Sequence, residues 1–167
     1  QRLLVHISQH APGHDAPREH LARGVVAHGA QMSGEGGEAG EGGEPKIIAR
    51  LLGRSERILS VAFTPDGKTL VAVGGTPARF GEIQIWDVPS KKLTRSILAT
   101  TDTLFGGALS PDGSHVVVGG ADNTVRVIEI ASGKELFKAG YHEDWVLDTV
   151  FGIDGKRIVS VGRDRAA

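Results

Sequence analysis

Two groups of residues in this sequence have types and spacings that could do chemistry. The first is a set of histidines near the start, in which His6, His10 and His14 are spaced four apart, as metal ligands on one helix face would be. Pro12-Gly13 interrupts any such helix, and no further ligand completes a set, so we favour an irregular segment over a metal site. The second is His142, which could act as a general base or as a structural hydrogen-bonding residue.

The composition excludes several other kinds of chemistry. There is no cysteine, which excludes disulfides, thiolate metal sites, cysteine nucleophiles and, within this chain, thioether attachment of haem. Nineteen Lys and Arg face twenty Asp and Glu, and the net charge of −1 argues against an electrostatic nucleic-acid binder. No apolar run is long enough to span a membrane. We therefore expect no cofactor, no metal, no nucleic acid and no membrane span.

A turn motif recurs along the chain and indicates how these residues are positioned. Thr64-Pro65-Asp66-Gly67 is followed after 46 residues by Ser110-Pro111-Asp112-Gly113 and after 42 more by Gly152-Ile153-Asp154-Gly155. Proline presets φ at the second turn position, and glycine at the fourth suits a type I turn that closes into a bulge. We therefore interpret Asp66, Gly67, Asp112, Gly113, Asp154 and Gly155 as turn residues, with no catalytic role for the three aspartates.

Apolar runs rich in valine and isoleucine flank each turn at the same spacing. The predicted strands are 58–63, 70–73, 82–88 and 93–98, then 104–109, 116–118, 124–130 and 135–138, and finally 146–151 and 158–161. Four short strands per repeat, apolar on both faces, are typical of a β-propeller blade. We predict an all-β fold with an N-terminal segment at 1–45, blades at 46–98 and 99–140, and a partial blade at 141–167. Residues 33–45, rich in glycine and glutamate, are expected to be a linker.

The repeat resembles the WD-repeat family. Ile85-Trp86-Asp87 matches the signature that closes the third strand, and Val127-Ile128-Glu129 is a degenerate copy. In that family a tetrad of His, Ser or Thr, Asp and Trp ties a blade together. The resemblance places His142, Ser160 and Asp164 in the third copy, Asp122 with Thr100 in the second, and Trp86 in the first. It thus implies a structural role for His142.

A narrower resemblance is to bacterial proteins that join WD repeats to a c-type cytochrome domain. It is carried by the strings GGTPARFGEIQIWDV, ADNTVRVIE, HEDWVLDTVF and SVGRDRAA. It implies a periplasmic or cell-envelope protein whose haem domain lies outside this chain. The copies amount to about two and a half repeats, fewer than the four to eight blades of a propeller. We therefore expect a fragment that exposes apolar faces, with the remaining blades of a parent chain as one partner.

The leading functional hypothesis is a non-catalytic scaffold that binds protein partners. Loops from successive blades converge at the ends of the disc and form a broad surface. By analogy with the family, this surface contains Arg57, Thr103 and Trp145 from loops that lead into inner strands, and Arg79, Phe80, Asn123 and Arg163 from loops between second and third strands. Phe80, flanked by Arg79, is the most suggestive anchor. For Trp145, a core role and a partner contact remain open.

Overall fold

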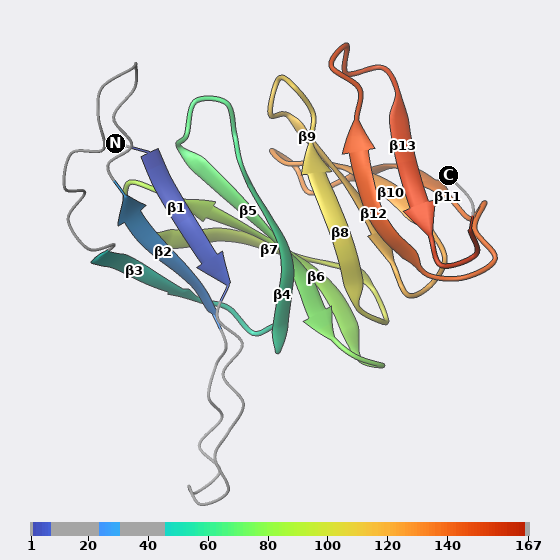
Figure 1. The fold of residues 1–167 in the computed structure, drawn as a ribbon, viewed down its shortest axis with the longest axis horizontal. Helices are drawn as coiled ribbons and strands as arrows, with labels where there is room; N and C mark the ends of the chain where they lie inside the picture. The colour runs from blue at the N-terminus through green and yellow to red at the C-terminus, as the bar shows by residue number, and fades with distance from the viewer. Residues whose placement is uncertain (1, 8–23, 31–45, 166–167) are drawn as a thin grey trace, which may run out of the picture.

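The computed structural model describes residues 2–7, 24–30 and 46–165, and these contain thirteen strands and no helix (Figure 1). In chain order the strands are β1 (Arg2–Ile7), β2 (Gly24–Ala30), β3 (Lys46–Leu52), β4 (Arg57–Phe63), β5 (Thr69–Thr76), β6 (Phe80–Asp87), β7 (Lys92–Thr100), β8 (Leu104–Leu109), β9 (His115–Gly120), β10 (Val125–Glu129), β11 (Glu135–Ala139), β12 (Val146–Phe151) and β13 (Ile158–Gly162). The all-β prediction is confirmed.

The strands form antiparallel meanders in chain order. β4-β5-β6-β7 and β8-β9-β10-β11 are four-stranded sheets, β12-β13 is a two-stranded sheet, and β1-β2-β3 is a three-stranded sheet. The ten strands expected after residue 57 are all present, and their ends differ from expectation by a few residues. The two four-stranded sheets have the architecture expected of blades.

The aspartates of the first two Asp-Gly turns tie the two ends of their hairpin loops, whereas Asp154 accepts from the Lys156 amide and Arg157. Asp66 Oδ1 accepts hydrogen bonds from Thr64 Oγ1 at 2.7 Å and from the Lys68 amide at 3.0 Å. The Gly67 amide donates to the Thr64 carbonyl at 2.8 Å, and Gly67 has a φ of 68°, which glycine adopts without strain. The corresponding backbone bonds form at Gly113 and Gly155, also at 2.8 Å. The backbones of the three turns are thus built alike.

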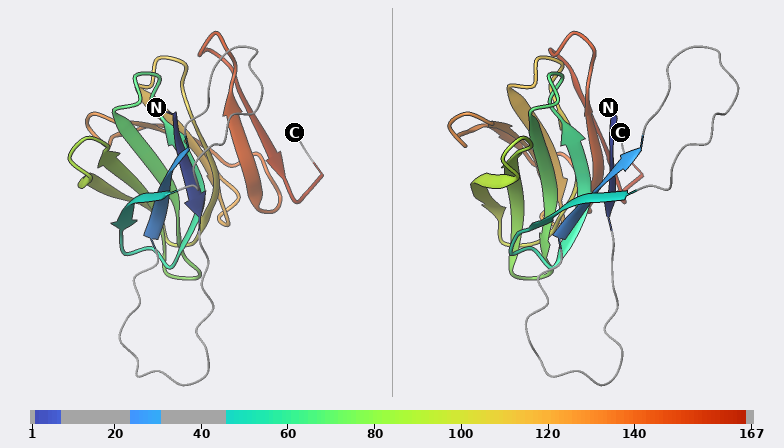
Figure 2. Two further views of the ribbon diagram at one scale, coloured as in Figure 1. Left: turned by 60° about the vertical axis from the view of Figure 1, so that its left-hand side comes forward. Right: turned by 90° about the vertical axis from the view of Figure 1, so that its left-hand side faces the viewer.

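Neighbouring sheets pack side by side through their faces, with the first strand of each sheet next to that of its neighbour (Figure 2). The two four-stranded sheets bury one apolar cluster, made of Val71, Val73, Ile83, Ile85, Leu104, Val116, Val118 and Ile128. Polar contacts join first strands to neighbouring sheets as well: Ser60 donates to the Gly107 carbonyl at 2.9 Å, and Thr149 to the Val117 carbonyl at 3.2 Å. Successive sheets therefore bury apolar clusters between them, three in the described residues.

The structure differs from expectation before Lys46. We expected an irregular segment there, but β1 and β2 pair with each other, and β2 pairs with β3. Strand β3, which we had placed in the first predicted blade, belongs to this sheet and not to β4-β7. The stretches RLLVHI and GVVAHGA lack the Asp-Gly turn that marks the other hairpins, so the repeat pattern did not reveal them. The expected linker at 33–45 lies outside the described residues.

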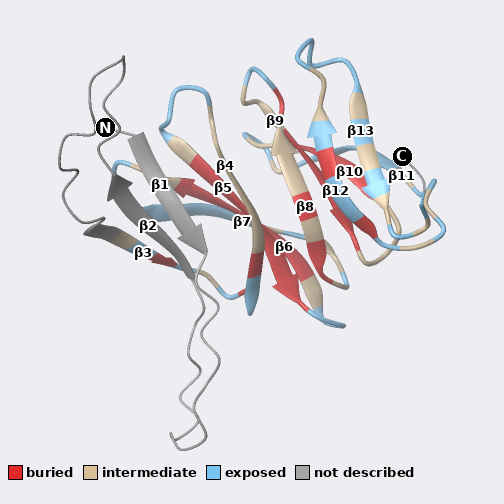
Figure 3. Cartoon of the chain, in the orientation of Figure 1, coloured by how far each residue is buried: buried red, intermediate tan, exposed pale blue. Residues whose placement is uncertain are grey.

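The burial of side chains differs between the central strands and the last sheet. Strands β5, β6, β9 and β10 are largely buried, whereas the β12-β13 sheet is largely exposed (Figure 3). Four of its apolar side chains, Leu147, Val150, Val159 and Val161, are each more than 40% exposed. The described residues form no helix long and apolar enough to cross a bilayer.

Candidate functional site

The sheets present two kinds of chain reversal at opposite ends. The Asp-Gly turns at 64–68, 110–114 and 152–156 form one end, called the turn end, at the top of Figure 1. The opposite end carries the loops that lead into β4, β8 and β12 and those that follow β5, β9 and β13. We call this end the loop-end surface; it comprises residues 53–57, 76–80, 100–104, 120–124, 140–146 and 163–165.

His142 is held at the loop end by both ring nitrogens. Nδ1 lies 3.0 Å from both carboxylate oxygens of Asp164, and Nε2 lies 2.9 Å from Ser160 Oγ. The Asp164 carboxylate also accepts the Glu143 amide at 2.8 Å. A Cβ on Gly162 would lie 2.4 Å from Nδ1, so the ring requires glycine at that position. The structure thus brings together the three residues predicted for the third copy, and both ring nitrogens lie within hydrogen-bond distance of them.

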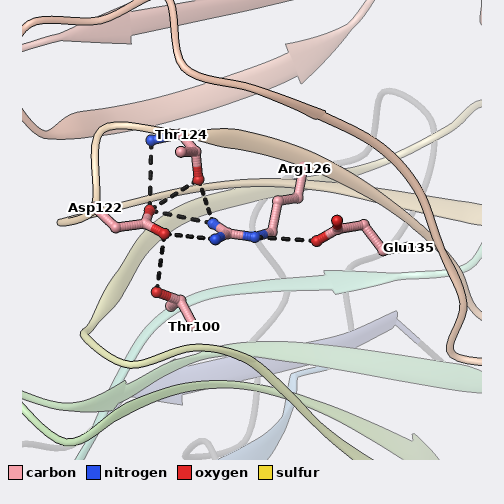
Figure 4. A network of polar contacts seen from close by, with 5 residues as sticks. All are labelled: Thr100, Asp122, Thr124, Arg126 and Glu135. Carbon is pink, nitrogen blue, oxygen red and sulfur yellow. Dashed lines mark hydrogen bonds and ion pairs between the residues drawn. The ribbon is translucent and has the colours of Figure 1, made fainter.

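The second sheet has a buried arginine at the corresponding place (Figure 4). Arg126, 3% exposed, donates to both oxygens of Asp122 and to Thr124 Oγ1, and its Nε lies 3.1 Å from Glu135 Oε2. Asp122 also accepts from Thr100 Oγ1 at 3.0 Å and from Thr124 Oγ1 at 2.9 Å. Burial raises the pKa of Asp122, but the hydrogen bonds from Arg126, Thr124 and Thr100 and the arginine charge outweigh it and lower the pKa to about 2.

The first sheet buries a carboxylate instead. Glu82, 1% exposed, accepts hydrogen bonds from Ser55, Ser96 and Gln84, and Arg54 Nε lies 3.4 Å from it. Burial raises the pKa of Glu82, but these bonds hold it below the ordinary 4.5. The Trp86 indole continues the network by donating to Gln84 Oε1 at 3.2 Å.

The three networks occupy corresponding positions in successive sheets. Aligned on the turns, Ser160 of β13 corresponds to Val118 of β9 and Ala72 of β5, which have no polar group. Directly across from these two, on the third strands, stand Arg126 and Gln84. In the first two sheets, whose second strand has no hydroxyl at the Ser160 position, a side chain of the third strand supplies the polar group instead. We did not predict Glu82, Gln84 or Arg126, although a polar side chain between apolar residues, as in EIQIW and VRVI, was the signal.

Trp145 lies at the loop-end surface and is 40% exposed. Its ring centroid is 5.2 Å from that of Phe105, and the Arg163 guanidinium lies 4.9 Å from it on the same ring. Arg163 Nε is also 3.4 Å from Asp144 Oδ2, and the Arg163 amide donates to the Trp145 carbonyl at 2.9 Å. The indole is therefore fixed in place while two-fifths of its surface faces solvent.

The other residues predicted for the surface differ in their exposure. Arg57, Arg79 and Arg163 are exposed, and Asn123, with a φ of 64°, donates to the Glu143 carbonyl at 3.2 Å. Thr103 is a correction: it is 3% exposed, because its carbonyl accepts the Ala121 amide and draws it against the second sheet. Phe80 is half-buried and lies beneath Arg54, whose guanidinium is 5.8 Å from the ring, so Arg54 rather than Arg79 contacts it.

The part of the chain that the structure describes holds no group of three or more acidic or histidine residues that could hold a metal ion. Of the spaced histidines, His10 and His14 lie outside the described residues, and only the backbone of His6, in β1, is described.

Comparison with known proteins agrees with this architecture. Residues 92–129 match the family model for the WD domain, G-beta repeat. This segment is similar to a WD repeat. It begins at the start of β7, the last strand of the first four-stranded sheet, and ends with β10 of the next. The matched segment thus links two consecutive sheets.

Three curated proteins are similar to part of the chain, and the names of two of them include WD repeats. The chain is 28% identical to Protein groucho of Drosophila melanogaster over 72% of its length. It is 32% identical to human WD repeat and SOCS box-containing protein 1, and 34% to the Danio rerio protein of that name, over 52% of its length in each case. The chain spans only 21% of each of these relatives.

Proposed function

We propose that the chain is a non-catalytic WD-repeat scaffold that binds protein partners through the loop-end surface. The observation that carries this proposal is Trp145, an exposed tryptophan held between Phe105 and Arg163. Tryptophan and arginine are the residues that most often dominate binding energy at protein interfaces, and a side chain fixed before binding loses little entropy on association.

The polar clusters support a scaffold because their central side chains are buried: those of His142 and Asp164 are 5% and 7% exposed, and Glu82 is 1% exposed. Both nitrogens of His142 are hydrogen-bonded, and the Glu82 and Asp122 carboxylates are held by hydrogen-bond donors that keep them ionised. These groups therefore serve to hold sheets and loops in place. The cytochrome-linked alternative and a location in the cell envelope rest on sequence resemblance and stay predictions.

The test is to compare capture of protein partners by the wild-type chain and by Trp145→Ala. Ile153→Ala is the matched control, because Ile153 is 95% exposed at the turn end. We expect Trp145→Ala to lose partners that the wild type and Ile153→Ala both retain. Circular dichroism of all three proteins must show the same fold. Equal capture by Trp145→Ala and the wild type would count against the proposal.

A further inference from the structure

Three arginines lie on the part of the loop-end surface that belongs to the first four-stranded sheet. Arg54 and Arg57 belong to the segment that leads into β4, and Arg79 belongs to the loop between β5 and β6. All three are exposed. Arg57 pairs in register with Gly75, and Gly75 pairs with Gly81, so Arg57 lies two strand spacings, about 10 Å, from the base of the Arg79 loop. At this separation, the extended side chains of Arg57 and Arg79 can contact the same ligand.

The positive charge of this cluster is only partly balanced within the described chain. Arg54 contacts Glu82, but among the described residues neither Arg57 nor Arg79 has an ion-pair partner. The nearby Asp102 carboxylate already accepts the Ala78 amide at 2.9 Å and the Thr103 amide at 2.7 Å. Two guanidinium groups therefore have no carboxylate partner among the described residues, and both can pair with a carboxylate of a ligand.

The cluster is also held in a defined shape. Ala78 has a φ of 56°, a left-handed conformation that its hydrogen bond to Asp102 stabilises. The Arg79 amide donates to the Thr76 carbonyl at 3.1 Å, and the Phe80 ring lies under Arg54. A Cβ on Gly74 would lie 2.0 Å from the Arg57 carbonyl, so glycine there allows β4 and β5 to approach closely. The backbone that carries Arg57 and Arg79 is thus held in a defined conformation, and Arg54 packs on Phe80.

We propose that this arginine cluster, Arg54, Arg57 and Arg79, binds an extended, acidic segment of a protein partner, an inference that rests on the proposed function. Carboxylates along the segment pair with Arg57 and Arg79, while its backbone lies across the Arg54–Phe80 pair. An acidic peptide suits the cluster better than nucleic acid, because three arginines can pair with a few carboxylates, whereas the chain, with a net charge of −1, lacks the excess of cationic residues typical of nucleic-acid binders.

The test measures binding of a short fluorescent peptide of alternating glutamate and serine, at low salt, by anisotropy. The matched probe is the same peptide with glutamine in place of glutamate, and a single-stranded oligonucleotide of equal charge is the third probe. We expect the double variant R57Q/R79Q to bind the glutamate peptide about tenfold more weakly than the wild type. K68Q/K156Q is the control with the same change in charge, because both lysines are exposed at the turn end.

Equal weakening in both double variants would overturn the proposal, since it would show a general charge effect. So would equal binding of the glutamine peptide, or tighter binding of the oligonucleotide. Capture by Trp145→Ala separates this result from the proposed function. If the arginine variant binds the acidic peptide normally while Trp145→Ala still loses its partners, only the acidic specificity fails. If Trp145→Ala also retains its partners, the proposed function fails with it.

Discussion

At the scale of single residues, corresponding positions in three successive sheets hold polar networks made of different residue types. His142 with Ser160, Arg126 with Asp122, and Gln84 with Glu82 each form a network at the loop end of a sheet. The resemblance to WD repeats indicated the first and part of the second. It could not indicate Arg126 or Glu82, because neither residue matches a position of the family's tetrad.

Replacing Arg126 by methionine should destabilise the fold. The variant leaves the Asp122 and Glu135 carboxylates without their cation, and we expect the free energy of unfolding to fall by about 2 kcal/mol. Both carboxylates are partly exposed, at 25% and 43%, which keeps the effect below that of a fully buried pair. Urea denaturation measures it. Arg157→Met is the control, since the Arg157–Asp154 pair is exposed, and equal losses in both variants would contradict this account.

The same network gives a pH dependence whose sign follows from Asp122. Its pKa in the folded protein is about 2, lower than the ordinary 3.8, so folding favours the ionised form. The resulting stabilisation is complete above the ordinary pKa and is lost as the pH falls from about 4 to 2. We therefore expect the difference in unfolding free energy between the wild type and Asp122→Asn to shrink over this range. A difference that does not change with pH would contradict the role of the carboxylate.

At the scale of elements, strands and turns were predictable wherever the Asp-Gly turn motif recurs. The three Asp-Gly turns indicated the register of six strands, because each turn sets where its hairpin reverses. The strands β1 and β2 were missed because their apolar runs are short and no such turn joins them. Thr103 was placed on the surface by analogy with the family's loops, which does not reveal that its carbonyl accepts the Ala121 amide of the second sheet.

Two turn glycines make a matched pair for testing how the sheets contact each other. Gly67 and Gly113 have φ values of 68° and 71°, so alanine is strained at either position, by about 1 kcal/mol. A Cβ at Gly67 meets nothing within 4 Å, whereas one at Gly113 would lie 2.8 Å from Pro65 Cδ. We expect Gly113→Ala to lower the urea midpoint more than Gly67→Ala. Equal shifts would show that the two turns do not press against each other in solution.

At the scale of the whole molecule, the sheets share apolar faces, and the β12-β13 sheet leaves one such face exposed. By the turn alignment, Val159 corresponds to Val117 and Val71, each of which is buried against a neighbouring sheet. An exposed apolar face next to an unpaired strand edge favours association.

We therefore expect the 167-residue chain to self-associate with rising concentration, and the double variant V159K/V161K to remain monomeric. Analytical ultracentrifugation measures the outcome. The control is Leu93→Lys, since Leu93 is 41% exposed on the outer strand β7. A wild-type chain that stays monomeric at every concentration would contradict the prediction.

The central claim is that the loop-end surface, and not the turn end, binds a protein partner. Hydrogen–deuterium exchange of the chain, alone and with a partner captured by the wild-type protein, tests it most directly. We predict that binding slows exchange at residues 76–80, 100–104 and 140–146 of the loop-end surface. Protection confined to the turns at 64–68, 110–114 and 152–156 would contradict the claim.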